Sequence, residues 1–232
     1  MAAYRRAVEQ GVDMIEIDLH RSRDGVVMIH HDAELTRLGG EGEIADRTAA
    51  ELAELNAAPG SVVPERMPML LDVLESFGRQ VELNLEIKVD RAGAPYAGLE
   101  ESVLAMLEER GLLGRMLISS FSDPVLERLR ALSPEVRLAV LASPRAPRRI
   151  LKRARRVLAE AINPHTALVT ANLVRRAHAE GIRVYPYTED DPAGMSRLLD
   201  LGVDGIITNH PARLRRLLEE RAEGRPERPA TP

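Results

Sequence analysis

A short pattern that occurs three times in the chain decides the fold. Its copies read AVEQGVDMIEID at 7–18, AHAEGIRVYPYT at 177–188 and LLDLGVDGIITN at 198–209. In each copy a helix-forming segment ends at a glycine, two residues follow, and a short apolar segment then begins. Glycine is the residue that most often ends a helix in a left-handed conformation. Strands that alternate with helices of this length predict parallel βα units.

The same alternation continues between these copies and predicts a barrel. An extra extended piece is expected at Val26–His31, and the glycine-containing segment 32–68 is expected to form the mouth of a site. A closed barrel of this type has about eight strands. Here the helix predicted at the start of the chain has no strand before it. We therefore predict an α/β fold, a TIM (β/α)8-type barrel that lacks its first strand. Its strands are predicted at Met14–Leu19, Val81–Lys88, Met116–Ser120, Val136–Ala142, Ala161–Asn163, Val184–Thr188 and Gly205–Thr208.

Composition limits the class of protein. A length of 232 residues with 44% hydrophobic residues suits one domain, which we expect over 1–222, followed by a disordered, proline-rich tail over 223–232. The chain has no cysteine, which excludes a disulfide scaffold and a thiolate site. A net charge of −4 and 3% aromatic residues argue against a nucleic-acid partner. No apolar run approaches the roughly 18 residues of a membrane span, and Met1–Val8 has no signal-peptide pattern, so we expect a cytoplasmic protein without membrane insertion.

Two predicted strands carry acids on one face, although barrel strands covered on both faces should be almost wholly apolar. Because side chains alternate along a strand, Glu16, Asp18 and His20 share the face expected to point into the barrel. On the second strand, the same alternation turns Glu86 and Lys88 inward. Buried carboxylates need a cation or must become neutral.

Two interpretations of these acids remain open. The three carboxylates of Glu16, Asp18 and Glu86 outnumber the single ammonium of Lys88, and oxygen ligands of this kind suit one Mg²⁺ or Ca²⁺ ion. The alternative is an ion-pair network of Glu86 with Lys88 and of Asp18 with an arginine. Lys88 is one of only two lysines, so a compact charge for a phosphate or a carboxylate is a further hypothesis.

Histidines follow the extended piece. His31 is a candidate general acid or base because its ordinary pKa is near neutrality, and His30 points the other way. The alternative for a lone loop histidine is a surface position. His165 is expected to have a packing or loop role. The basic segment Arg145–Arg156 is interpreted as a solvated helix face, with an anionic lipid surface as the alternative.

Taken together, these motifs resemble the glycerophosphodiester phosphodiesterase family, and the resemblance extends from Met1 to about Leu218. The matching stretches include IEIDLHRSRDG at 15–25, MIHHDAELTR at 28–37, LNLEIK at 83–88, RVYPYTEDDPAGM at 183–195 and LGVDGIITNHP at 201–211.

The resemblance implies the fold and the chemistry of the site. It implies a (β/α)8 barrel with an insertion after the second strand, and a divalent cation, Mg²⁺ or Ca²⁺, held by Glu16, Asp18 and Glu86. His31 would be one of two catalytic histidines. The implied substrate-binding residues are Lys88, Phe121 and Tyr187. The implied activity is metal-dependent hydrolysis of a small glycerophosphodiester to glycerol 3-phosphate and an alcohol.

One departure from the family concerns the first strand. The family begins with a strand that ends in His-Arg-Gly, followed by Pro-Glu-Asn-Thr, and this segment supplies the other catalytic histidine. Met1 falls after it, so we expect impaired activity in residues 1–232, and we interpret the gap as a start site placed too far downstream or a truncated gene. Two other functions remain as alternatives: a non-catalytic barrel that acts as a binding module, and a metal-assisted barrel enzyme that acts on a sugar phosphate.

Overall fold

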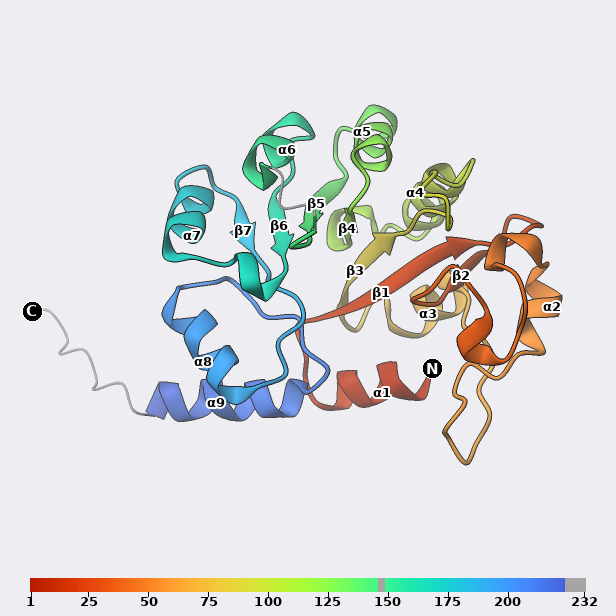
Figure 1. The fold of residues 1–232 in the computed structure, drawn as a ribbon, viewed down its shortest axis with the longest axis horizontal. Coiled ribbons are helices and arrows are strands. Elements are labelled where there is room, and N and C mark those ends of the chain that lie inside the picture. The colour runs from red at the N-terminus through yellow and green to blue at the C-terminus, as the bar shows by residue number, and fades with distance from the viewer. Residues whose placement is uncertain (146–148, 224–232) are drawn as a thin grey trace, which may run out of the picture.

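The fold is an open barrel of parallel strands wrapped by helices (Figure 1). A computed structural model describes residues 1–145 and 149–223. The expected tail over 223–232 lies outside the described residues except for Glu223. The helices and strands are α1 Ala2–Glu9, β1 Met14–Arg21, β2 Val27–Ile29, α2 Ala49–Ala53, α3 Leu70–Phe77, β3 Glu82–Ile87, α4 Leu99–Glu109, β4 Leu117–Ser120, α5 Asp123–Leu132, β5 Arg137–Ala142, α6 Ile150–Arg156, β6 Ala161–Pro164, α7 Ala171–His178, β7 Arg183–Val184, α8 Pro192–Asp200 and α9 Pro211–Glu223.

The sheet has the order β2-β1-β3-β4-β5-β6-β7. All neighbours are parallel except β1 and β2, which pair antiparallel through Leu19–Arg21. The register places Asp18 opposite Glu86, and Glu86 opposite Ser119. The parallel barrel predicted from the repeated pattern is therefore confirmed, and its glycines at the helix ends, Gly11, Gly181 and Gly202, have φ of 67, 69 and 79°.

Two layers of side chains explain why the strands hold together. On the outer face, Ile15, Ile17 and Leu19 are buried against the helices, as their alternation predicts. On the inner face, Leu117, Ala139 and Ala161 form a small apolar layer near the amino ends of the strands. The inner face changes from apolar to polar toward the carboxyl ends, where Ser119, Glu86 and Asn163 are buried.

The strand predicted at Gly205–Thr208 is wrong. These residues belong to no strand, although main-chain hydrogen bonds tie Ile207 N to Pro186 O at 2.9 Å and Glu189 N to Ile207 O at 3.1 Å. Pro186 has no N–H to donate, so a regular ladder cannot continue along this segment. β7 ends at Val184, short of the predicted boundary, because Pro164 of the neighbouring β6 has no N–H to donate to Tyr185 O, although Tyr185 N and Tyr187 N still donate to Ile162 O and Pro164 O at 2.9 and 3.1 Å.

The segment 32–68 forms an insertion beside β2, with a small core of its own. This core consists of Met28, Leu35, Ile44, Leu52 and Met67. The insertion contains α2, which begins with a capping box: Thr48 Oγ1 accepts from Glu51 N, and the Glu51 carboxylate accepts from Thr48 N at 2.7 Å. The insertion therefore has its own packing and is more than a loop.

The basic segment Arg145–Arg156 contains α6, which begins at Ile150. Residues 146–148 lie outside the described residues. Arg153 binds Asp123 at 2.6 Å, and Arg156 binds Glu127 at 2.9 Å. These ion pairs join α6 to α5 and support the interpretation as a helix face. No helix in the described part of the chain is both long and apolar enough to span a bilayer.

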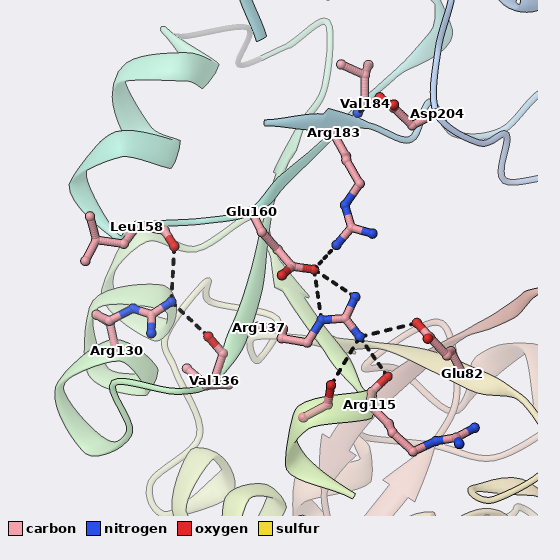
Figure 2. Close-up of polar contacts among 11 residues, drawn as sticks. Glu82, Arg115, Arg130, Val136, Arg137, Leu158, Glu160, Arg183, Val184 and Asp204 are labelled. Carbon is pink, nitrogen blue, oxygen red and sulfur yellow. Dashed lines mark hydrogen bonds and ion pairs between the residues drawn. The ribbon is translucent and has the colours of Figure 1, made fainter. Parts of the chain in front are cut away.

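An ion-pair network joins the amino ends of the strands (Figure 2). Arg137, the first residue of β5, donates to Glu160 at 2.9 Å and to Glu82 at 3.3 Å. Arg183, the first residue of β7, also binds Glu160. The Arg137 side chain is only 18% exposed, and its pKa, which burial lowers, is raised overall by Glu160 and Glu82. The network lies at the end of the barrel opposite the acids of β1 and β3.

Replacing Glu160 with glutamine is expected to lower the free energy of unfolding by about 1–2 kcal/mol, because Arg137 and Arg183 would lose their shared carboxylate in a partly buried place. Urea denaturation measures this change. The control is Glu127→Gln, since Glu127 and Arg156 form an ion pair that is about half exposed (48% and 49%) and should contribute less than about 0.5 kcal/mol. Equal effects of the two variants would contradict the assignment of this network to barrel stability.

Candidate active site

Three carboxylates converge on the inner face of β1 and β3. Glu16, Asp18 and Glu86 each offer an oxygen, and these oxygens all lie within 4.8 Å of one another. Glu16 and Asp18 share a face because they are two residues apart on β1, and the parallel register brings Glu86 opposite Asp18. The structure therefore brings together the three acids that the strand alternation predicts to face inward.

Lys88 lies against two of these acids. Its Nζ is 2.8 Å from Asp18 Oδ1 and 2.5 Å from Glu86 Oε1. Burial lowers the pKa of Lys88, but the adjacent carboxylates outweigh this and raise it above its ordinary value. The expected ion pair of Glu86 with Lys88 is thus present. The expected arginine partner of Asp18 is not found among the described residues; Lys88 takes that place.

Glu16 forms no ion pair within the described residues, and the charge of Lys88 lowers its pKa by less than the other effects raise it. Its Oε1 is buried and has no hydrogen-bond partner in the described structure. Burial, followed by the charges of Asp18 and Glu86, raises the pKa of Glu16 to about 8. Burial is also the main cause that raises the pKa of Glu86. Three convergent oxygen donors with one buried, unpartnered oxygen fit a hard divalent cation.

The pKa of Glu16 predicts how stability depends on pH. A carboxyl group whose pKa is raised by folding stabilises the fold at low pH and loses that contribution as pH rises from about 4.5 to about 8. Without divalent cations, we expect the free energy of unfolding to fall by about 2–4 kcal/mol over this range. Thermal denaturation at several pH values measures it, and Mg²⁺ or Ca²⁺ should restore stability at pH 8. A Glu16→Gln variant should lose this dependence; an unchanged slope would contradict it.

His31 lies in the turn after β2 and is exposed. Its Nδ1 is 2.7 Å from Asp32 Oδ1, and Arg37 binds the other oxygen of Asp32 at 3.1 Å. Because Nδ1 is engaged, Nε2 is the nitrogen that can act on a substrate. Burial raises the pKa of Glu86, and the charge of Lys88 lowers it. The charge of His31 lowers it further by a smaller amount, so the His31 ring lies within electrostatic reach of Glu86.

Phe121 and Tyr187 form one aromatic wall. Their rings meet edge to face with centroids 5.9 Å apart, and the Tyr187 hydroxyl donates to Ala142 O at 3.1 Å. Burial and then the charge of Glu86 raise the pKa of Tyr187 to about 12, which places this ring near the acids. His165 packs on Tyr187 with centroids 5.7 Å apart, and its Nδ1 accepts from Ala167 N. The packing role expected for His165 is confirmed.

Sequence reasoning missed several residues near the site. Asp32 could have been recognised as the partner of His31 from their adjacency. Nothing in the sequence pattern predicts that Tyr4 lies near the acids. Burial, followed by the charges of Asp18 and Glu16, raises the pKa of the Tyr4 hydroxyl, so α1 lies beside these acids. Tyr96 contacts the ring of His20 and is separated from it by 76 residues, so no local pattern could predict this pair.

The parallel strands with helices between them and acids on their inner face place the chain in the TIM-barrel class. Comparison with known families then assigns the chain. A family model described as "Glycerophosphoryl diester phosphodiesterase family" matches residues 1–213. The chain belongs to this family, which places it among the phosphoric diester hydrolases.

Relatives and solved structures agree with this assignment. A glycerophosphodiester phosphodiesterase of Caldanaerobacter subterraneus is 31% identical and is aligned over 95% of this chain and 91% of its own length. A glycerophosphodiester phosphodiesterase of Bacillus altitudinis is also 31% identical, over 95% and 92%. A phosphodiesterase of Oleispira antarctica, solved in complex with the product sn-glycerol-3-phosphate, has a TM-score of 0.82 at 27% identity and covers 94% of this chain and 90% of its own.

Proposed function

We propose that this protein hydrolyses glycerophosphodiesters to glycerol 3-phosphate and an alcohol in a reaction that requires one divalent cation. The observation that carries the proposal is the convergence of Glu16, Asp18 and Glu86 on one point in the mouth of a barrel of this family. The product complex of the Oleispira relative supports the substrate class.

Glu16, Asp18 and Glu86 would hold the cation, Mg²⁺ or Ca²⁺. When bound, such an ion neutralises the phosphodiester and the charge that develops on its oxygens. Lys88, held between Asp18 and Glu86, contacts the phosphate or the glycerol end of the substrate. Phe121 and Tyr187 form the wall against which the substrate lies.

His31 acts as the general acid. The bond from phosphorus to the departing alcohol breaks, and His31 Nε2 gives its proton to the alkoxide. Asp32 keeps the ring in place through Nδ1. The attacking oxygen, from water or from the substrate's own glycerol hydroxyl, forms a bond to phosphorus and loses its proton, which the family's other catalytic histidine would accept. Either route consumes one water molecule overall, and the products are glycerol 3-phosphate and the alcohol.

Release of glycerol 3-phosphate from glycerophosphocholine tests the proposal. The assay compares residues 1–232 with a polypeptide that carries the family's His-Arg-Gly and Glu-Asn-Thr segment ahead of Met1, each with Mg²⁺, with Ca²⁺ and with a chelator. We expect cation-dependent release, about 10²–10⁴ times faster in the extended polypeptide because it has a second histidine. Absence of hydrolysis in both polypeptides would contradict the proposal.

The same experiment separates the alternatives. A binding module would bind glycerol 3-phosphate in calorimetry but would release none from the diester in either polypeptide. An enzyme that acts on a sugar phosphate would convert that substrate and leave glycerophosphocholine intact. The family assignment favours the diester.

A further inference from the structure

His20 is a buried polar residue that the proposed reaction does not use. It lies on β1 and is 1% exposed. Its Nδ1 is 2.8 Å from the hydroxyl of Tyr96, and its Nε2 is 3.5 Å from the main-chain oxygen of His31. A buried imidazole is unfavourable unless its nitrogens have partners. Here both nitrogens have one, and the partners come from two different loops.

The partners of His20 determine where its proton lies. A main-chain oxygen only accepts, so Nε2 must carry the hydrogen that faces His31. Nδ1 is then an acceptor, and the Tyr96 hydroxyl donates to it. Tyr96 lies between β3 and α4 and is 9% exposed, and its ring meets His20 edge to face with centroids 5.7 Å apart. The main-chain oxygen of His31 thus fixes one tautomer of His20, and the Tyr96 hydroxyl occupies the nitrogen that this tautomer leaves without a proton.

The peptide group between His31 and Asp32 is held at both ends. His20 holds its carbonyl oxygen, and Nδ1 of His30 accepts from its N–H, on Asp32, at 3.0 Å. The turn is also joined to β1 by His30 N, which donates to Asp18 O at 3.1 Å. This peptide connects the two residues whose side chains form the His31–Asp32 pair. Its orientation therefore sets the direction of the His31 ring.

We propose that His20 is a positioning residue, supported by Tyr96, which fixes the peptide between His31 and Asp32 and so directs His31 at the site. The role in catalysis rests on the proposed function of His31. The role in orienting the turn rests on the contacts alone.

Two substitutions of His20 separate its two contacts. In His20→Gln the side-chain amide nitrogen can take the place of Nε2, which retains the donor to His31. In His20→Asn the shorter side chain reaches only the place of Nδ1, so the contact with His31 is lost. Tyr96→Phe removes the donor to Nδ1 and leaves the contact of Nε2 with His31. Tyr185→Phe is the control, since Tyr185 packs against the apolar inner layer near the amino ends of the strands.

Nuclear magnetic resonance of residues 1–232 gives readouts that need no turnover. We expect His20 to carry its proton on Nε2 both in the unsubstituted protein and in Tyr96→Phe, because the main-chain oxygen of His31 accepts from Nε2 in both. We expect the Asp32 amide to exchange with solvent about tenfold faster in His20→Asn than in His20→Gln, as the loss of one hydrogen bond predicts. A proton on Nδ1, or equal exchange in both variants, would overturn the proposal.

Kinetics test the consequence for the reaction. In the extended polypeptide, kcat for glycerophosphocholine should fall about 10- to 100-fold in His20→Asn with KM unchanged, and His20→Gln should recover most of it. Equal losses in both variants, accompanied by equal losses in melting temperature, would show a merely structural role and overturn the assignment. If no version hydrolyses the substrate, the proposed function fails, and tautomer and exchange still decide whether His20 orients the turn.

Discussion

A Glu86→Gln variant is expected to lose about 10³-fold in kcat/KM for glycerophosphocholine, because it removes one of the three carboxylates that would hold the cation and the partner that orients Lys88. The measurement is cation-dependent release of glycerol 3-phosphate in the extended polypeptide. Lys88 would retain Asp18 as a partner, at 2.8 Å in the present structure.

The same substitution is expected to raise the melting temperature in the absence of cations. Burial raises the pKa of Glu86, which means that the folded protein disfavours its charge. A neutral amide would remove that cost and would also lower the pKa of Glu16. Lost activity with gained stability is typical of residues kept for function.

Glu82→Gln is the matched control because Glu82 begins the same strand and points to the same side, but pairs with Arg137 at the other end of the barrel. It should leave kcat/KM unchanged. Turnover retained in Glu86→Gln would remove Glu86 from the cation site and with it the proposed mechanism.

Replacing His31 with glutamine is expected to lower kcat about 10²–10⁴-fold for glycerophosphocholine, since choline is a poor leaving group that needs a proton. A substrate with p-nitrophenol in place of choline should lose far less, because that leaving group departs as a stable anion. Comparison of the two substrates therefore identifies the step at which His31 acts.

The His31 substitution should leave the melting temperature unchanged, since the side chain is 67% exposed. The matched control is His178→Gln: His178 also pairs with an aspartate, Asp204, at 2.8 Å, but on α7 outside the barrel. It should have no kinetic effect. A His31 variant with equal losses for both substrates would exclude the role of general acid.

The sequence predicts best those features that depend on local periodicity. Alternation along β1 and β3 correctly separates Ile15 and Ile17 from Glu16 and Asp18, because the two faces of a barrel strand have different surroundings. The pair Thr48 and Glu51 also predicts the capping box that the structure shows at the start of α2, since a capping box depends on residues only three apart.

Features that depend on distant partners were not predicted. Asp123 stands before Pro124, a pattern that is typical of a helix cap, but it lies inside α5 and its carboxylate binds Arg153 of α6. The contact of Tyr96 with His20 likewise depends on where two loops meet. At Gly205–Thr208 the apolar pattern is that of a strand, yet the proline on the neighbouring segment prevents a ladder.

The small core of the insertion has a consequence for how the protein would fail on heating. Met28 of β2 belongs to that core, whereas Val27 and Ile29 pack in the main one, and His31 follows two residues later. A unit with few buried side chains opens at a lower free-energy cost than the rest of a domain. Thermal inactivation is thus expected to precede global unfolding, because local opening of this unit displaces His31 while the parallel strands stay paired.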